Sequence, residues 1–249
     1  MQEHIDRFSS VAGKYAEFRP VYPEELYTFL LSRVAVRDLA WDAGTGNGQV
    51  AHVLARHFRR VIGTDISTAQ LGQAFEADNI QYRVASAEHS GISGSTVNLI
   101  TVAQAVHWFD LNAFAEEVAR VSTPGAMLAV WGYGLLRIRK DIDDVIDYLY
   151  ADILDGYWDP QRTYLDRNYR DLNFPFDELP GHTFEMHHSR DVDALKGYLG
   201  TWSAVNAFIR REQTDPIQII ASALDQCMGH SVMLCRTPVF LRLWRVGQT

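Results

Sequence analysis

The chain has 249 residues, enough for one globular domain with a sizeable core. A composition that is 47% hydrophobic and 22% charged is typical of folded globular proteins and excludes a disordered or fibrous chain. The formal net charge of −8 argues against duplex nucleic acid or an anionic membrane surface as the partner.

The two cysteines, Cys227 and Cys235, are too few for a disulfide scaffold. No Cys and His residues are spaced as in a zinc site, so we expect no metal. The chain begins without a basic stretch followed by an apolar one, and its longest apolar runs have the length of strands. We therefore expect a cytoplasmic protein without a membrane partner, and no sequence feature indicates its oligomeric state.

Short apolar runs alternate with amphipathic stretches along the first half of the chain. Proline suits the first helical turn, and leucines share one face after it, which predicts a helix over residues 23–34. Five strands are predicted at residues 39–41, 61–63, 80–84, 97–103 and 126–131, of which the first and the fourth are expected to be buried. Apolar residues at helical spacing predict helices between the strands, at residues 50–58, 68–75 and 111–118, with Ser67 capping the second.

This alternation predicts right-handed β-α-β units and a mostly parallel sheet. We expect a doubly wound, Rossmann-like α/β unit over residues 36–134, preceded by an N-terminal helical segment, residues 1–35. Further along, a helix is predicted at 138–154, an irregular stretch at 157–180, and strands at 183–188 and 239–246 with two or three helices between them. Residues 1–249 are therefore interpreted as one domain, in which 135–236 complete the sheet and add a helical cap, and 237–249 hold the last strand.

The segment that says most about function joins the first predicted strand to the next helix. It reads Asp42-Ala43-Gly44-Thr45-Gly46-Asn47-Gly48. Glycines let the backbone approach a ligand closely, and a helix N-terminus presents free N–H groups, so the loop suits a nucleotide-like cofactor. Asp65 ends the next strand, 23 positions after Asp42, where a carboxylate can accept hydrogen bonds from both hydroxyls of an adenosine ribose.

The spacing of the glycines discriminates between cofactors. A dinucleotide fingerprint has a third glycine three positions after the second, where this chain has Gln49. Here the third glycine comes two positions after the second, and an acidic residue begins the loop. The spacing therefore argues against a nucleotide-cofactor oxidoreductase, which is kept as a weaker alternative. A second alternative is that the glycines only form a tight turn and bind no ligand.

At these residues the chain resembles the class I S-adenosylmethionine-dependent methyltransferases that act on small molecules, a group that includes methyltransferase type 11 and trans-aconitate methyltransferase-like proteins. The resemblance extends over most of the chain through short patches, which are Phe8 to Pro23, Asp42 to Gly48, Gly63 to Ser67, Ala85 to Glu88, Ala105 to Asp110, Arg120 to Gly125, Trp158 to Pro160, Tyr169, and Phe174 to Phe176. Three positions depart from the usual pattern: Thr45 stands in place of Cys or Ser, Gln70 in place of Met, and Ala126 in place of Gly.

The resemblance implies a seven-stranded, mostly parallel sheet with an antiparallel last strand, and S-adenosylmethionine as the cofactor, with S-adenosylhomocysteine as the product. It implies that the methionine portion is held by Asp42 and the loop backbone, that is Ala43, Gly44, Thr45 and Gly46. It places Asp65 at the ribose and Ile66 on the adenine, whose edge is lined by Ser86, Ala87 and Glu88. It also places Gln104 below the sulfonium, and Tyr15 and Arg19 over the cofactor.

His107 lies just after the fourth strand, where ligands meet in open α/β sheets. It is a candidate catalytic residue, as a general base or as an anchor for an acidic substrate, because its pKa ordinarily lies near the working pH. A structural histidine bound to a backbone carbonyl is the equal alternative. The candidate substrate-binding residues are Tyr22, Trp108, Tyr133 and Trp202, of which Trp108 could also be a core residue.

We therefore predict a methyltransferase that acts on a small molecule, with an O-nucleophile such as a carboxylate as the suggested acceptor. Nucleic-acid methyltransferases of this fold often carry an Asn/Asp-Pro-Pro-aromatic motif where this chain reads Gln104-Ala105-Val106-His107. A cofactor-binding regulator without turnover and a partner-binding scaffold stay open as alternatives, because methyl transfer needs positioning more than a diagnostic catalytic residue.

Overall fold

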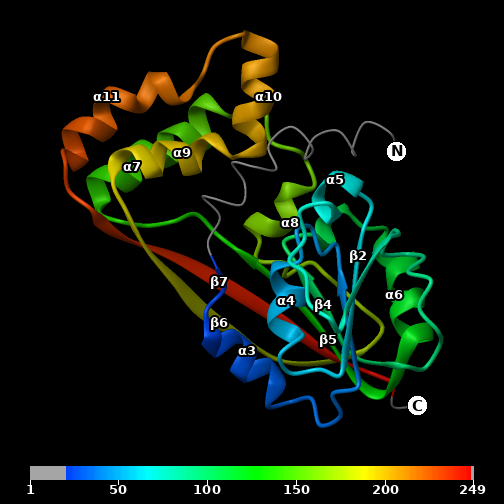
Figure 1. Ribbon diagram of the computed structural model, residues 1–249. Helices are drawn as coiled ribbons and strands as arrows, with labels where there is room; N and C mark the ends of the chain where they lie inside the picture. Colours follow the sequence, from blue (N-terminus) through cyan, green and yellow to red (C-terminus); the bar gives the residue numbers. More distant parts are fainter. Residues whose placement is uncertain (1–20, 248–249) are drawn as a thin grey trace.

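A computed structural model describes residues 21–247, in which seven strands form one sheet in the order β3-β2-β1-β4-β5-β7-β6 (Figure 1). β7 is antiparallel to both of its neighbours, and the other pairs are parallel. The predicted Rossmann-like, seven-stranded sheet with an antiparallel last strand is confirmed. The strands are β1 Leu39–Ala43, β2 Arg60–Asp65, β3 Ile80–Val84, β4 Val97–Ala103, β5 Ser122–Tyr133, β6 Asp177–Arg190 and β7 Met233–Val246.

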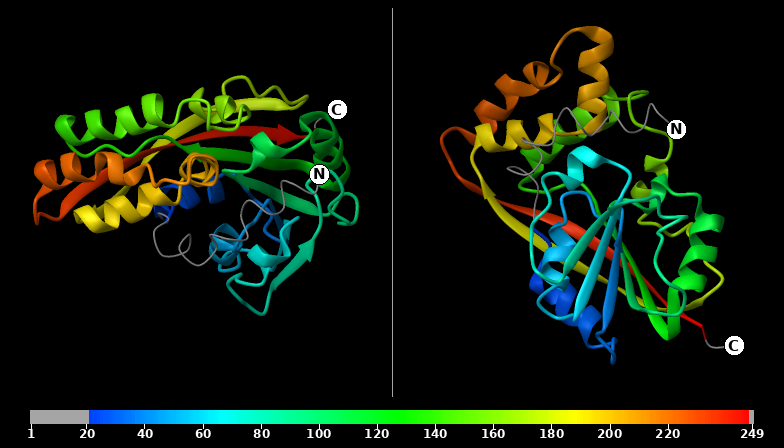
Figure 2. Two further views of the ribbon diagram at one scale, coloured as in Figure 1. Left: turned by 90° about the horizontal axis from the view of Figure 1, so that it is seen from above. Right: turned by 45° about the vertical axis from the view of Figure 1, so that its right-hand side comes forward.

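Successive residues of each strand face opposite sides of the sheet, so the sheet separates two cores. Leu39 and Trp41 enter one core, and Ala40 between them enters the other. The helices α3 (Glu24–Leu31) and α4 (Gln49–Leu54) cover one face, whereas α6 (Leu111–Val121) covers the opposite face (Figure 2). The central strands are therefore buried on both sides, as parallel strands usually are.

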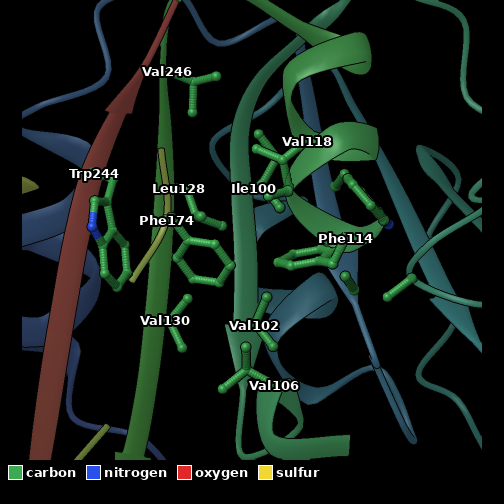
Figure 3. Packing of buried hydrophobic residues seen from close by; sticks show 14 of the residues in the cluster. Ile100, Val102, Val106, Phe114, Val118, Leu128, Val130, Phe174, Trp244 and Val246 are labelled. Atoms are coloured by element: carbon green, nitrogen blue, oxygen red, sulfur yellow. The ribbon is translucent and has the colours of Figure 1, made fainter. Parts of the chain in front are cut away.

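Aromatic rings fill the core beneath α6. Figure 3 shows Phe114 of α6 and Phe174 facing each other above the strands, with their ring centroids 5.9 Å apart. Trp244 of β7 meets the edge of Phe174 at 5.1 Å. The segment around Phe174 thus covers the α6 face of the sheet where β5 and β7 lie side by side.

The helical cap has an apolar core of its own, built around Ile142, Leu149, Leu199, Val205 and Leu224. It comprises α7 Lys140–Tyr148, a π-helical turn η2 Leu149–Ile153, α9 Val192–Gly200, α10 Ser203–Glu212 and α11 Ile217–Met228. It lies where β6 ends and β7 begins (Figure 1). Because β7 alone runs in the opposite direction, the cap stands at the edge of the sheet where the other strands end. Between residues 21 and 247, no helix has the length and apolar character needed to cross a membrane.

Some predicted helices are shorter than expected. Ser67 caps α5 (Thr68–Leu71) as predicted, since its hydroxyl accepts from Gln70 N at 3.3 Å, but the helix does not extend to Phe75. Gly72 follows its last residue, and Phe75 N donates instead to Asn47 O at 3.1 Å, which turns the chain back towards the glycine loop. The predicted helix at 50–58 ends at Leu54, and the stretch predicted to be irregular contains a short helix, α8 (Arg162–Asp166).

Candidate active site

The glycine loop after β1 packs closely against the rest of the protein at Gly44 and has free space beside it at Gly46. Gly44, Gly46 and Gly48 have φ angles of +66°, +56° and +76°, the left-handed region that favours glycine. A Cβ on Gly44 would lie 2.6 Å from Cβ of Ala105, whereas a Cβ on Gly46 would have no neighbour closer than 3.9 Å. The backbone therefore packs against the chain after β4 at Gly44 and leaves space for a ligand at Gly46.

Asp42, near the end of β1, fixes this loop by a side-chain hydrogen bond. Its side chain is buried, Thr45 Oγ1 donates to Oδ2 at 2.5 Å, and Thr101 Oγ1 donates to Oδ1 at 2.7 Å. Burial raises the pKa of Asp42 to about 6, against the opposing effect of the two hydroxyl hydrogen bonds. Asp42 is 1% exposed and stiffens the loop through Thr45, and its predicted contact with the cofactor stays a prediction.

Thr101 was not among the predicted site residues. It is a polar residue within the apolar strand β4, and that interruption is the signal by which the sequence could have indicated it. Thr45, which departs from the family pattern, still supplies a hydroxyl to Asp42. The departure therefore preserves the hydrogen bond that fixes the loop.

Asp65 joins the glycine loop to the end of β2. Gly46 N donates to Asp65 Oδ2 and Ser67 N donates to Oδ1, both at 2.8 Å. Burial raises the pKa of Asp65, and the backbone N–H groups that donate to it act in the opposite direction. Ile66, the next residue, leaves 47% of its surface exposed. A half-buried carboxylate and an exposed apolar side chain thus stand beside the open part of the loop.

The ends of β3 and β4 add the remaining residues predicted to bind the cofactor. Ala87 is buried, Ser86 and Glu88 are half-buried, and Glu88 Oε1 accepts from Asp110 N at 2.9 Å. Gln104 has a left-handed φ of +57°, a strain of about 1–3 kcal/mol for a residue with a side chain. Its backbone N donates to Trp131 O at 2.9 Å and its Nε2 to Tyr133 O at 3.3 Å, and these bonds hold the strained conformation.

His107 lies in the single 3-10 turn η1 (Val106–Trp108) beyond β4 and is 9% exposed. Its Nδ1 lies 2.8 Å from the hydroxyl of Tyr169, so its partner is a buried side chain instead of a backbone carbonyl. Burial, and to a smaller extent the positive charge of Arg162, lower the pKa of His107 to about 4. His107 is therefore neutral near pH 7, and its orientation is set by Tyr169, which follows α8.

The aromatic residues predicted to bind substrate lie in three places. Tyr22 meets Tyr133 with ring centroids 6.3 Å apart, on the face of the sheet covered by α3. Trp202 instead packs in the cap, 5.6 Å from Trp158. Trp108 is half-buried, and its ring centroid lies 5.0 Å from that of His107.

Tyr15 and Arg19, which were predicted to close over the cofactor, lie outside the described residues. Within residues 21–247, no group of three or more His, Cys, Asp or Glu side chains is arranged to hold a metal ion.

We expect His107 to make the protein lose stability in mild acid. Its pKa is about 4 in the folded chain and near 6.5 in the unfolded one, so as the pH falls the unfolded chain takes up the proton first. The contribution is fully present above pH 6.5 and is lost towards pH 4, with about 2 kcal/mol lost at pH 5. Urea unfolding measures the free energy of unfolding at pH 7.5 and 5.0. Between these two pH values, His107→Asn should lose about 2 kcal/mol less of it than the wild type does. Equal losses in the two proteins would contradict the assignment.

Comparison with known proteins agrees with this geometry. A family model described as a methyltransferase domain matches residues 41–130. A protein of Dictyostelium discoideum that carries a methyltransferase name is 37% identical over 223 residues, which cover 88% of this chain and 85% of the relative.

Two solved structures extend the comparison. A protein from Anaeromyxobacter dehalogenans described as a type II methyltransferase is 40% identical, with a TM-score of 0.86 over 93% of this chain and 100% of its own. A phosphoethanolamine N-methyltransferase of Haemonchus contortus shares the fold, with a TM-score of 0.52 at 13% identity over 98% of this chain and 60% of its own. With close relatives along nearly its whole length, the chain belongs to the class I S-adenosylmethionine-dependent methyltransferases, the family that its motifs predict.

Proposed function

We propose that this methyltransferase moves a methyl group from S-adenosylmethionine to a small-molecule acceptor, with the cofactor held between the glycine loop and the end of β2. The observation that carries the proposal is the arrangement of Asp65. Its carboxylate is fixed by Gly46 N and Ser67 N, beside the open side of Gly46 and the exposed Ile66.

The described residues fit such a cofactor. Asp65 offers a carboxylate to the two ribose hydroxyls, since Gly46 N and Ser67 N donate to different oxygens and a carboxylate has about four lone-pair sites. Ile66 offers an apolar surface to the adenine, and the space at Gly46 admits the ligand close to the backbone. The roles that the resemblance gives to the loop backbone (Ala43, Gly44, Thr45), to Ser86, Ala87 and Glu88 at the adenine edge, and to Tyr15 and Arg19 stay predictions.

The protein's own task is positioning. When bound, the cofactor supplies an electrophilic methyl group on a sulfonium, and direct displacement needs no covalent bond to the protein. The chain must align the acceptor and exclude water. Gln104 is held rigidly beside the site by the carbonyls of Trp131 and Tyr133, and we assign it to the sulfonium end.

We assign proton acceptance from the acceptor to His107. Tyr169 occupies Nδ1, and Nε2 makes no hydrogen bond to any residue of the described range. Because the ring is neutral near pH 7, Nε2 can take a proton from an acceptor that has one to lose. Trp108, Tyr22, Tyr133 and Trp202 are proposed to wall the acceptor.

The acceptor is proposed to be a small molecule of the cytoplasm, with a carboxylate or another O-nucleophile as the reacting group. The net charge of −8 supports a free small molecule over nucleic acid or an anionic membrane. Fold alone does not select the acceptor, because caps differ between enzymes that share this sheet.

The test is release of S-adenosylhomocysteine from S-adenosylmethionine across polycarboxylic acids, phenols and amines. We expect turnover with one acceptor class, and loss of that turnover in Asp65→Ala. Binding of S-adenosylhomocysteine is measured separately by calorimetry. Binding without turnover on any class, in panel or in cell extract, favours the regulator alternative, and a chain that does not bind S-adenosylhomocysteine overturns the proposal.

A further inference from the structure

We infer that Arg162 recognises an oxyanion on the methyl acceptor, an assignment that rests on the proposed function. Arg162 begins α8, which packs against η1 at the end of β4. Leu165 of the same helix lies over β5, so closely that a Cβ on Gly132 would be 2.5 Å from its Cδ1. The hydroxyl of Tyr169, which follows α8, lies 2.8 Å from His107 Nδ1, so α8 stands beside His107 at the edge of the sheet where an acceptor must meet the cofactor.

The side chain of Arg162 is held in place by the cap. Its guanidinium carbon lies 4.2 Å from the ring centroid of Trp158 and 5.3 Å from that of Tyr150. Its Nε donates to the Tyr150 hydroxyl at 2.9 Å, and that hydroxyl donates to Asp166 Oδ1 at 2.6 Å. The side chain is 24% exposed, so most of its charge is shielded from solvent while part stays accessible.

The two terminal amino groups of Arg162 have no hydrogen-bond acceptor among residues 21–247, and Asp166 Oδ1 lies 3.6 Å from Nε. Two other arginines near the cap are already bound by carboxylates. Arg137 donates to both oxygens of Asp147 at 2.8 Å, and Arg139 donates to both oxygens of Asp141 at 2.7 and 2.8 Å. Arg162 is thus a rigid, partly desolvated cation whose planar fork is still available.

This arrangement selects a class of ligand. The two terminal amino groups form a fork that matches two oxygens of one carboxylate or phosphate, and such pairs are stronger than neutral hydrogen bonds. After burial, the positive charge of Arg162 is the second cause that lowers the pKa of His107, and Asp159 acts in the opposite direction. A bound oxyanion would lie within reach of both the fixed cation and the proposed proton acceptor.

The experiment titrates the S-adenosylhomocysteine-loaded protein with benzoate, phenyl phosphate and benzamide, and follows tryptophan fluorescence. We expect at least one of the two anions to bind about tenfold or more tightly than neutral benzamide. Arg162→Gln should weaken the preferred anion about 10- to 100-fold and leave benzamide unchanged. Arg162→Lys keeps the charge without the fork and should fall between the two. The preferred anion distinguishes a carboxylate from a phosphate ester.

The matched control is Arg167→Gln, which removes the same charge just after α8. Arg167 is 63% exposed on its side chain and already pairs with Asp171 at 2.9 Å, so its loss should leave all three dissociation constants unchanged. Calorimetry with S-adenosylhomocysteine accompanies every variant, and its failure in the wild type counts against the proposed function itself. Two results would overturn the Arg162 assignment in protein that still binds S-adenosylhomocysteine. One is that the wild type prefers neither anion over benzamide, and the other is that Arg162→Gln keeps the preference. Should that variant not fold, Arg162→Lys decides: wild-type anion affinity in it overturns the assignment.

Discussion

Replacing Asp65 with alanine is expected to weaken binding of S-adenosylhomocysteine about 100- to 10,000-fold. The carboxylate would accept two charge-assisted hydrogen bonds from the ribose hydroxyls, each worth about 1.5–3 kcal/mol. Every 1.4 kcal/mol is about a factor of ten in the dissociation constant, so losing both gives at least two decades. Isothermal titration calorimetry at pH 7.5 measures the change directly.

The variant also removes a structural acceptor, because Asp65 receives hydrogen bonds from Gly46 N and Ser67 N. Asp191→Ala is the matched control, since Asp191 caps α9 by accepting from Ala194 N at 2.8 Å. Both variants should lose about 1 kcal/mol of unfolding free energy, but only Asp65→Ala should lose cofactor affinity. A dissociation constant within about threefold of wild type in Asp65→Ala would remove the proposed ribose contact.

Two strands of the sheet, the edge strand β3 and the central strand β4, could be predicted from the sequence to the residue. Residues 80–84 and 97–103 were expected as strands, and β3 and β4 have those bounds. Burial on both faces leaves β4 mostly apolar, with Asn98 and Thr101 as its polar residues, and polar neighbours delimit the strand. Helix α6 was equally legible, because an apolar stripe follows Asp110, whose side chain accepts from Asn112 N and Ala113 N.

The elements that were mispredicted depend on distant contacts. The chain after α5 leaves its helical pattern because Phe75 N bonds to the glycine loop. The helix predicted at 138–154 is present as α7 and η2, and only its repeat differs: it passes into a π-helical turn at Leu149, which is fully buried in the cap core.

The same holds for the candidate site. Its glycine loop and Asp65 form a local pattern that can be recognised in this one sequence without a structure. The Thr101 hydroxyl reaches Asp42 across 59 residues, and Tyr169 reaches His107 across 62. No periodicity or short motif encodes such pairs, so the rigidity of Asp42 and the orientation of His107 become evident only once the chain is folded.

Gly44→Ala is expected to cost about 2–5 kcal/mol of unfolding free energy, for two separable reasons. The φ of +66° disfavours any side chain by about 1–2 kcal/mol. The new methyl group would also lie 2.6 Å from Cβ of Ala105, a rigid neighbour that cannot rotate away, which adds about 1–3 kcal/mol of overpacking. Urea denaturation monitored by tryptophan fluorescence measures the sum.

Two further variants separate these causes. Gly91 has a φ of +67° and no atom within 4 Å of an added Cβ, so Gly91→Ala isolates the conformational cost at about 1–2 kcal/mol. Ala105→Gly removes the colliding methyl group, so the double variant with Gly44→Ala should recover about 1 kcal/mol or more beyond additivity. A coupling energy near zero would mean that the loop moves to avoid the contact. Such a movement would carry Gly46 N away from Asp65, so cofactor affinity would then fall in Gly44→Ala without a matching loss of stability.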